Sequence, residues 1–232
     1  MKNFFLVFAM ILVIYTSAAC SFFTEDELII TASKSSKNSI STSTELNNPQ
    51  LKIKSNEEIV YPVDFIFPIK DACLTENLSL LPGAPRVYRN GTHEGVDFYQ
   101  DFACVEVNAG TKVFAIEDGI VIRVDKDYVD LDQQLLEILM DSDNKQYNQD
   151  QKLDIYRGRQ IWLEHRYGIV SRYAHLSEIN DDVKLGFKVS KGQLIGLVGN
   201  SGTPESITKP GTEMHLHLEI RQGSKYLGQG QS

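Results

Sequence analysis

The chain has 232 residues, of which 42% are hydrophobic, and a formal net charge of −8 at pH 7. This length and composition are sufficient for a substantial hydrophobic core and favour one folded domain over two. A basic stretch that could neutralise phosphates is missing, and an anionic surface would be repelled by them, which argues against a nucleic-acid-binding protein. The charge indicates nothing positive about a substrate.

Residues 1–20 have the pattern of an export signal: one lysine, an apolar run over residues 4–15, and then small residues. The apolar run is too short to span a bilayer comfortably as a helix, so an uncleaved anchor is the weaker alternative. The sequence Ser17-Ala18-Ala19-Cys20 also resembles the lipobox of bacterial lipoproteins, although Ser17 departs from the aliphatic residue usual there. We predict an exported protein that is cut before Cys20, with membrane attachment through lipid on Cys20 as a further hypothesis.

Residues 21–58 are interpreted as a flexible tether, because residues 31–50 are mostly Ser, Thr, Asn and Lys with little apolar surface to bury. The folded domain is expected over residues 59–232. Parity of the three cysteines in an exported chain favours a bridge between Cys73 and Cys104, with Cys20 left over. Such a bridge closes a loop of about thirty residues and is worth roughly 3 to 4 kcal/mol in the chain-entropy model. Two unpaired buried thiols are the alternative.

Short strands separated by turns dominate the folded part. They are expected over residues 112–117, 119–125, 160–165, 169–174, 187–189 and 193–198. The first two are predicted to form a hairpin through Asp118-Gly119 and the next two a hairpin through Tyr167-Gly168. Six or seven strands at this spacing predict an all-β fold, either an antiparallel sandwich or a flattened barrel.

Residues 128–159 interrupt this pattern and are interpreted as one insertion between two strands. Residues 130–140 carry apolar side chains at helical spacing, and Asp130 with Gln133 imitates a capping box. We predict one short amphipathic helix there, followed by a polar stretch. Most such insertions are decoration, although loops at the rim of a sheet often shape a binding groove.

Residues 214–220 alternate strictly between apolar and polar side chains, which predicts a half-buried strand. The apolar members enter the core, and His215 and His217 stand side by side on the opposite face. Two histidines in this arrangement can hold a metal with one imidazole and handle protons with the other. A polar strand face in contact with water is the alternative interpretation.

Further histidines stand at His93, His165 and His175. His93 lies four residues before Asp97, and the glycines at positions 91 and 95 favour a loop entering a strand over a helix. His93-Glu94 imitates the first half of the zincin motif His-Glu-x-x-His, but the fifth residue and the required helix are missing. His165 is interpreted as structural.

Four motifs occur in the same order as in lysostaphin-type (LytM-like) zinc metalloendopeptidases, which cut peptide bonds of peptidoglycan. They are His93-x-x-x-Asp97, Tyr173-Ala174-His175-Leu176, Gly192-Gln193-x-Ile195-Gly196 with Gly199-Asn200-Ser201-Gly202, and His215-Leu216-His217. The resemblance extends from about residue 94 to residue 222. It implies the sandwich or flattened barrel of that family and hydrolysis of peptidoglycan peptides.

The resemblance implies that His93, Asp97 and His217 bind one zinc ion and that His175 and His215 are the catalytic pair. Two imidazoles and one carboxylate leave a fourth zinc position open for water, whose pKa such a metal lowers toward neutrality. Because the zincin glutamate is missing, the two uncoordinated histidines must manage the protons and the developing oxyanion. Tyr88 is a further candidate for the oxyanion, with packing as its alternative role.

Two other function classes fit parts of the sequence. Some members of the family have lost ligands and act as non-catalytic, wall-binding regulators of other hydrolases, although all five site residues are intact here. The strand pairs around Gly119 and Gly192 also resemble lipoyl-type carrier domains, but Lys191 lacks the flanking residues of a modifiable lysine. The scissile bond and the oligomeric state are left open by the sequence.

Overall fold

The computed structural model describes residues 64–230. The predicted signal, the tether, Cys20 and the expected start of the fold at residue 59 therefore lie outside the described residues. Within residues 64–230, none of the helices has the length and apolar character needed to cross a membrane.

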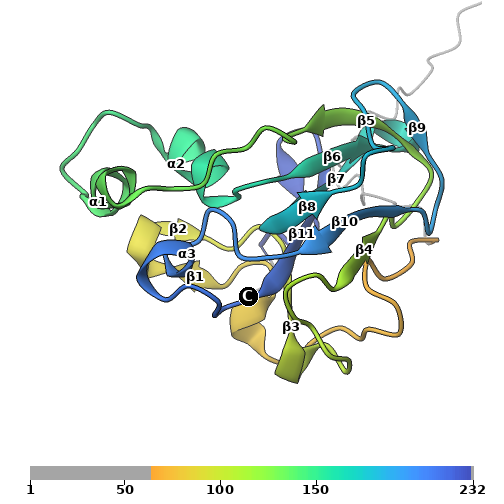
Figure 1. Ribbon diagram of the computed structural model, residues 1–232, viewed down its shortest axis with the longest axis horizontal. Coiled ribbons are helices and arrows are strands. Elements are labelled where there is room, and N and C mark those ends of the chain that lie inside the picture. Colours follow the sequence, from red (N-terminus) through yellow and green to blue (C-terminus); the bar gives the residue numbers. More distant parts are fainter. Residues whose placement is uncertain (1–63, 231–232) are drawn as a thin grey trace, which may run out of the picture. The chain divides into compact units, whose positions relative to one another are not determined.

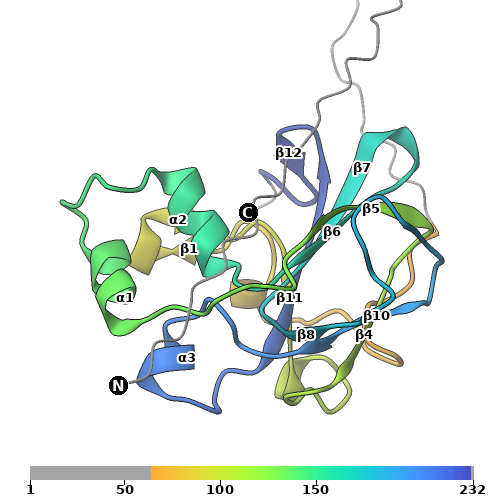
Figure 2. The ribbon, with the colours of Figure 1, turned by 45° about the horizontal axis from the view of Figure 1, so that its top comes forward.

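Short strands make up most of the described part, and Figures 1 and 2 show them from two directions. The strands are β1 (Pro85–Arg86), β2 (Gly91–Thr92), β3 (Val96–Tyr99), β4 (Lys112–Phe114), β5 (Gly119–Val124), β6 (Ile161–Glu164), β7 (Ile169–Ala174), β8 (Leu176–Ile179), β9 (Lys188–Val189), β10 (Leu194–Val198), β11 (His215–Gln222) and β12 (Lys225–Tyr226). The helices are α1 (Gln133–Met140), α2 (Gln149–Tyr156) and α3 (Glu205–Thr208), with single 3₁₀ turns at Leu78–Leu80, Val87–Arg89, Gln100–Phe102 and Arg166–Gly168.

Two antiparallel sheets enclose the main core. The larger sheet has the order β12-β11-β7-β6-β5-β9, with β3 also paired to β11, and the smaller sheet has the order β4-β10-β8. Strands of both sheets send fully buried side chains into one cluster, for example Leu163, Tyr173 and Leu216 from the larger sheet and Leu176 and Ile195 from the smaller. Burial of such side chains is the main favourable contribution to folding. The predicted all-β antiparallel fold is confirmed.

The disulfide between Cys73 and Cys104 is present, as predicted, and joins Cα atoms 5.5 Å apart. The amide of Cys73 also donates to the carbonyl of Ala103 at 2.9 Å. Bridge and hydrogen bond together tie the segment that precedes the first strand to the loop that follows β3.

Of the two predicted hairpins, the second is confirmed, because β6 and β7 pair in antiparallel register across the turn at Tyr167 and Gly168. The first is wrong: β4 pairs with β10 in the smaller sheet, whereas β5 pairs with β6 and β9 in the larger one. After β4 the amide of Ala115 still donates to the carbonyl of Gln193. The Asp118-Gly119 turn therefore carries the chain from one sheet to the other.

The insertion at residues 128–159 contains two helices, one more than predicted. Helix α1 begins at Gln133 and is capped by Asp132, not by Asp130 as predicted. The stretch interpreted as only polar contains α2, which has a true capping box formed by Asn148 and Gln151. The two helices bury a small core of their own, made of Leu131, Leu136, Leu139 and Tyr156.

His165 lies in the interior, and its hydrogen bonds define its protonation state. Its Nδ1 donates to the carbonyl of Asp118 at 2.8 Å, so its Nε2 accepts from the hydroxyl of Ser171 at 2.7 Å. Burial lowers the pKa of His165 below its ordinary value. The neutral imidazole is therefore the form that the folded state stabilises, in keeping with the structural role predicted for His165.

This state has a consequence for stability. The pKa of His165 is lower in the folded than in the unfolded protein. Its contribution to the free energy of unfolding is therefore complete above a pH of about 6.5 and decreases as the pH falls below that value. We expect His165→Asn to reduce the free energy of unfolding at pH 8 by about 1 to 3 kcal/mol, with a smaller difference at pH 5.5. Urea unfolding of both proteins across this range measures the difference, and a difference that stays constant would contradict the assignment.

Candidate metal centre and active site

Strand β11 places the predicted site residues beside one another. It lies between β3 and β7, and its register sets His217 opposite Asp97 on one side and Ala174 on the other. His175 directly follows Ala174. The close approach of the 93–97 segment requires glycine at Gly95, where a Cβ atom would lie 2.4 Å from the carbonyl oxygen of Leu218.

The histidine face of β11 is buried, not solvated. His215, His217 and Glu219 expose 5%, 7% and 0% of their surface. The apolar members of the strand, Leu216 and Leu218, are buried in the main core as predicted. The alternative in which this face meets water is therefore wrong, and polar groups this deeply buried need defined partners.

The three predicted metal ligands converge on one point. His93 Nε2 lies 2.9 Å from Asp97 Oδ1, His217 Nδ1 lies 2.7 Å from the same oxygen, and the two ring nitrogens are 3.0 Å apart. Within residues 64–230 these three side chains are the group of potential metal ligands whose donor atoms all lie within 4.8 Å of one another.

Hydrogen bonds on the far sides of the rings fix what each ring presents to this point. His93 Nδ1 lies 3.0 Å from the carbonyl of Leu81, and His217 Nε2 lies 3.2 Å from the carboxylate of Glu219. Both partners can only accept, so the neutral form of each imidazole carries its proton there and directs its other ring nitrogen toward Asp97, as metal binding requires. Positive charge is favoured between these atoms, and an outer carboxylate or carbonyl on a ligand histidine is typical of zinc sites.

The pKa values reflect this crowding. Burial alone would raise the pKa of Asp97, but hydrogen bonds with His217 and His93 hold it well below its usual value. Burial alone would lower the pKa of His217, yet hydrogen bonds with Asp97 and Glu219 raise it to about 9. The pKa of His93 is lowered, mainly by burial. The carboxylate is therefore ionised and attracts positive charge to the centre of the group.

The predicted catalytic histidines lie against the ligand group. The rings of His175 and His215 have centroids 4.5 Å apart, and His215 Nε2 lies 3.9 Å from Asp97 Oδ1. Their Nδ1 atoms donate to backbone carbonyls, His175 to Ser201 at 2.9 Å and His215 to Glu213 at 2.8 Å. Each Nε2 is thus an acceptor, and no backbone group of residues 64–230 is bonded to it. Burial lowers the pKa of both rings, which keeps them neutral.

His175 stands at the corner where the chain passes from β7 in the larger sheet to β8 in the smaller one. This turn gives it a left-handed backbone with φ of 61°. Such a conformation costs free energy in a residue other than glycine and persists only where neighbours hold it. Here the amide of His175 donates to the carbonyl of Arg157 at 2.9 Å.

Several contributors to the site were not predicted from the sequence. Tyr99 stacks on His215, with ring centroids 4.2 Å apart and planes 12° apart. Arg86 donates to Asp97 Oδ2 at 3.0 Å, which leaves Oδ1 for the ligand group. Glu219 is on the same strand face as both histidines, so the two-residue period of β11 could have indicated it. No local sequence pattern marks Arg157 as part of the site, because it follows a helix that is far in the sequence from the strands that carry the ligands.

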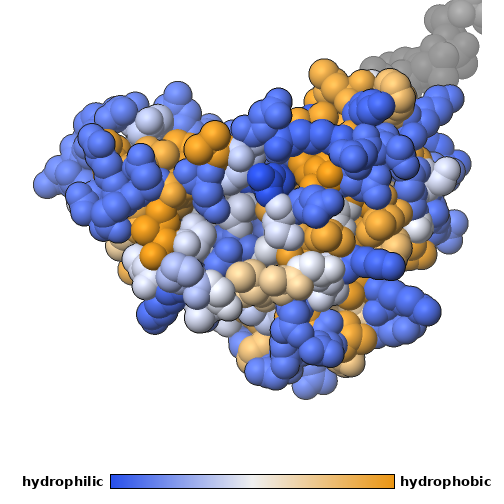
Figure 3. All heavy atoms as spheres, in the orientation of Figure 1, coloured by the Kyte–Doolittle hydropathy of each residue, from blue (hydrophilic) through white to orange (hydrophobic). Residues whose placement is uncertain are grey.

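A cleft of about 470 Å³ opens over the five predicted residues. One wall comes from the segment that contains Arg86, Tyr88 and Arg89, and another from Met140 and Tyr156 of the insertion. Tyr88 is 51% exposed, and its ring packs edge-on against that of Tyr156, with the ring centroids 5.6 Å apart. In Figure 3 hydrophobic residues gather on the insertion beside paler and hydrophilic residues. The cleft is therefore lined by both apolar and charged groups.

Two known proteins are similar to this chain in sequence. Peptidoglycan DD-endopeptidase ShyA of Vibrio cholerae is 45% identical over 136 residues, which are 59% of this chain and 22% of that protein. An uncharacterized metalloprotease of Buchnera aphidicola is 26% identical over 136 residues, which are 59% of this chain and 25% of that protein. The chain thus spans less than two thirds of the length of either relative.

Among solved structures, a zinc containing peptidase from Vibrio cholerae is 24% identical, with a TM-score of 0.45 over 71% of this chain and 38% of that chain. The catalytic domain of lysostaphin from Staphylococcus simulans is 26% identical, with a TM-score of 0.39 over 62% of this chain and 80% of that chain. A family match extends over residues 91–229, more than half of the chain, and includes all five predicted site residues. The chain belongs to Peptidase family M23.

Proposed function

We propose that the protein is a zinc-dependent endopeptidase that hydrolyses peptide bonds of bacterial peptidoglycan. The observation that carries this proposal is the convergence of His93, Asp97 and His217 beside the free Nε2 atoms of two buried, neutral histidines. A metal with three protein ligands and an open position is the catalytic type of zinc site. The cleft above the site gives a peptide access to it.

Zinc fits the donor set, which has two imidazole nitrogens and one carboxylate oxygen. His93, Asp97 and His217 would hold it, and Arg86 would leave only Oδ1 of the carboxylate free for binding. When bound, zinc supplies a Lewis acid that polarises the scissile carbonyl and acidifies water. The hydrogen bonds of the two ligand histidines, from His93 to the Leu81 carbonyl and from His217 to the Glu219 carboxylate, would fix both rings in position.

We assign the proton transfers to His175 and His215. Each ring donates from Nδ1 to a backbone carbonyl, so each Nε2 can accept a proton from the attacking water and later deliver it to the leaving amine. A protonated ring would also stabilise the oxyanion that develops on the substrate. Stacking on Tyr99 would hold the His215 ring in the required orientation. Tyr88, on the cleft wall, contacts substrate in this scheme.

Peptidoglycan is proposed as the substrate because the relative that is 45% identical is named a peptidoglycan DD-endopeptidase. The protein would then act outside the cytoplasm, in agreement with the export signal predicted over residues 1–20. Attachment to a membrane through lipid on Cys20, with residues 21–58 as the tether, remains part of the proposal. The domain over residues 59–232 would act on the wall within reach of that tether.

The separate roles proposed for His215, in proton transfer, and His217, in zinc binding, can be tested directly. His215→Ala should keep zinc and fold but lose at least about a hundredfold in peptidoglycan cleavage, because it removes a proton-transfer group. His217→Ala, two residues along the same strand, should lose zinc and activity together. Zinc content and release of wall fragments are measured on both variants. An active His215→Ala protein, or one that has shed its zinc, would contradict the assignment.

Zinc should also stabilise the fold, since a ligand that binds only the folded state contributes about 4 kcal/mol at a thousandfold excess over its Kd. We expect a chelator to lower the midpoint of thermal unfolding and added zinc to restore it. Asp97→Ala should show no response to either treatment. If the wild-type protein binds zinc yet cleaves no wall preparation, a wall-binding regulator replaces the enzyme as the better description.

A further inference from the structure

We propose that Arg157, at the end of helix α2, is a positioning residue that holds His217 in place through Glu219. The insertion at residues 128–159 thereby completes the metal site. This inference rests on the proposed function only in taking His217 as a zinc ligand. It concerns the affinity of the site for zinc, not the peptide bond that is cut.

Glu219 is the direct link to the ligand. Its side chain is fully buried, and its Oε1 lies 3.2 Å from His217 Nε2 and 2.7 Å from Arg157 Nε. Its other oxygen is contacted more loosely, by Arg172 at 3.4 Å and by Arg221 at 3.1 Å. A carboxylate taken out of water needs a close counter-charge. Arg157 provides the shortest of these contacts, on the oxygen that faces the ligand ring.

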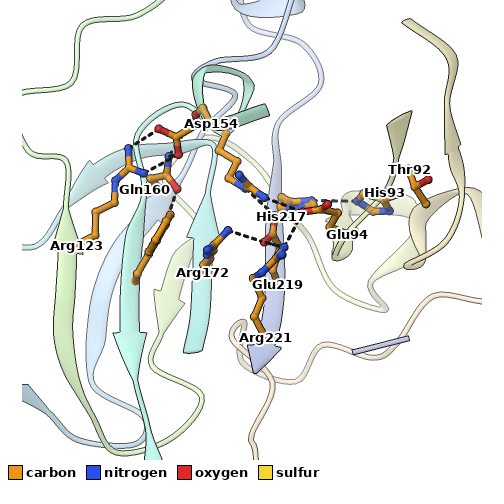
Figure 4. A network of polar contacts seen from close by, with 12 residues as sticks. Thr92, His93, Glu94, Arg123, Asp154, Gln160, Arg172, His217, Glu219 and Arg221 are labelled. Carbon is orange, nitrogen blue, oxygen red and sulfur yellow. Dashed lines mark hydrogen bonds and ion pairs between the residues drawn. The ribbon is translucent and has the colours of Figure 1, made fainter. Parts of the chain in front are cut away.

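Arg157 also reaches the other ligand-bearing segment. Its Nη2 donates to Glu94 Oε2 at 2.9 Å, and Glu94 directly follows His93. Figure 4 shows Glu94 between His93 and His217, and Glu219 and Arg221 below His217. Arg157 therefore joins the strand that carries His217 to the loop that carries His93. Arg221 also bridges Glu94 and Glu219, at 2.6 and 3.1 Å, but of the two arginines Arg157 is the one that contacts the Glu219 oxygen facing His217. Lysine is not equivalent here, because its ammonium lacks the planar fork that holds both carboxylates in one fixed geometry.

The backbone of Arg157 makes a third contact with the site. Its carbonyl accepts the amide of His175, which is the residue with the left-handed backbone. The next residue, Gly158, packs closely on the loop that follows β10. A Cβ atom at this position would lie 2.2 Å from the carbonyl oxygen of Ser201. That same carbonyl accepts from His175 Nδ1. The end of the insertion thus supports one proposed catalytic histidine and one proposed ligand.

A purely structural role for Arg157 would be to anchor the insertion to the sheets, and Arg123 offers a matched control for it. Arg123 of β5 forms an ion pair with Asp154 of α2, at 2.6 Å, and with Asp125 at 2.8 Å. Figure 4 shows this cluster apart from the Glu219 cluster. Arg123 therefore anchors the same helix without contacting Glu94, Glu219 or a site histidine.

The test is the zinc affinity of the full chain, measured by competition with a chromophoric chelator. Glu219→Gln, which changes the outer partner of His217 itself, should bind zinc about 10- to 100-fold more weakly than wild type, and Arg157→Met, which acts through Glu219, about 10-fold more weakly. Arg157→Lys should fall between Arg157→Met and wild type, and Arg123→Met should bind zinc as tightly as wild type. Urea unfolding with chelator present reports the structural cost of each change separately.

Cobalt-substituted protein gives a second readout, which does not depend on Arg157→Met being stable. The visible absorption of bound cobalt should change in Arg157→Lys and in Glu219→Gln, and remain that of wild type in Arg123→Met. Unchanged zinc affinity in the Arg157 variants, or an equal loss in Arg123→Met, would overturn the positioning role. A wild-type protein that binds no zinc would instead refute the proposed function.

Discussion

The convergence of three potential ligand atoms between β3, β11 and the loop before β3 is the constraint on which the rest of the site depends. His93, Asp97 and His217 present these atoms to one point at separations of 2.7 to 3.0 Å. Such an arrangement needs positive charge at its centre, which a proton on His217 supplies in the absence of a metal and which a bound metal would replace. The hydrogen bonds to Leu81 and Glu219 ensure that both rings direct their other nitrogen inward. Folding thus builds a site whose electrostatics favour a divalent metal.

Local patterns in the sequence predicted the parts of this site that lie on regular strands. The alternation over residues 214–220 predicted β11 and placed His215 and His217 on one face, because side chains of a strand alternate with a period of two. The order of the motifs then related His93, Asp97 and His175 to that strand through the family resemblance. The disulfide between Cys73 and Cys104 followed from parity alone and is present.

What could not be predicted depends on contacts between segments far apart in the chain. The turn at Asp118 and Gly119 has the composition of a hairpin, but β4 and β5 belong to different sheets, and their partners are chosen by the packing of the whole core. Arg157 gives no signal in its own neighbourhood. Its role depends on carboxylates 62 and 63 positions away in the sequence, which only the folded chain brings together.

The most direct test of this account is the location of zinc in crystals of the protein, from anomalous diffraction at the zinc absorption edge. The account predicts one peak bonded to His93 Nε2, Asp97 Oδ1 and His217 Nδ1, at about 2.0 to 2.2 Å from each atom. His175 and His215 should lie nearby without being bonded to it. A peak coordinated by either of these two histidines, or a loaded crystal with no peak among the three ligands, would contradict it.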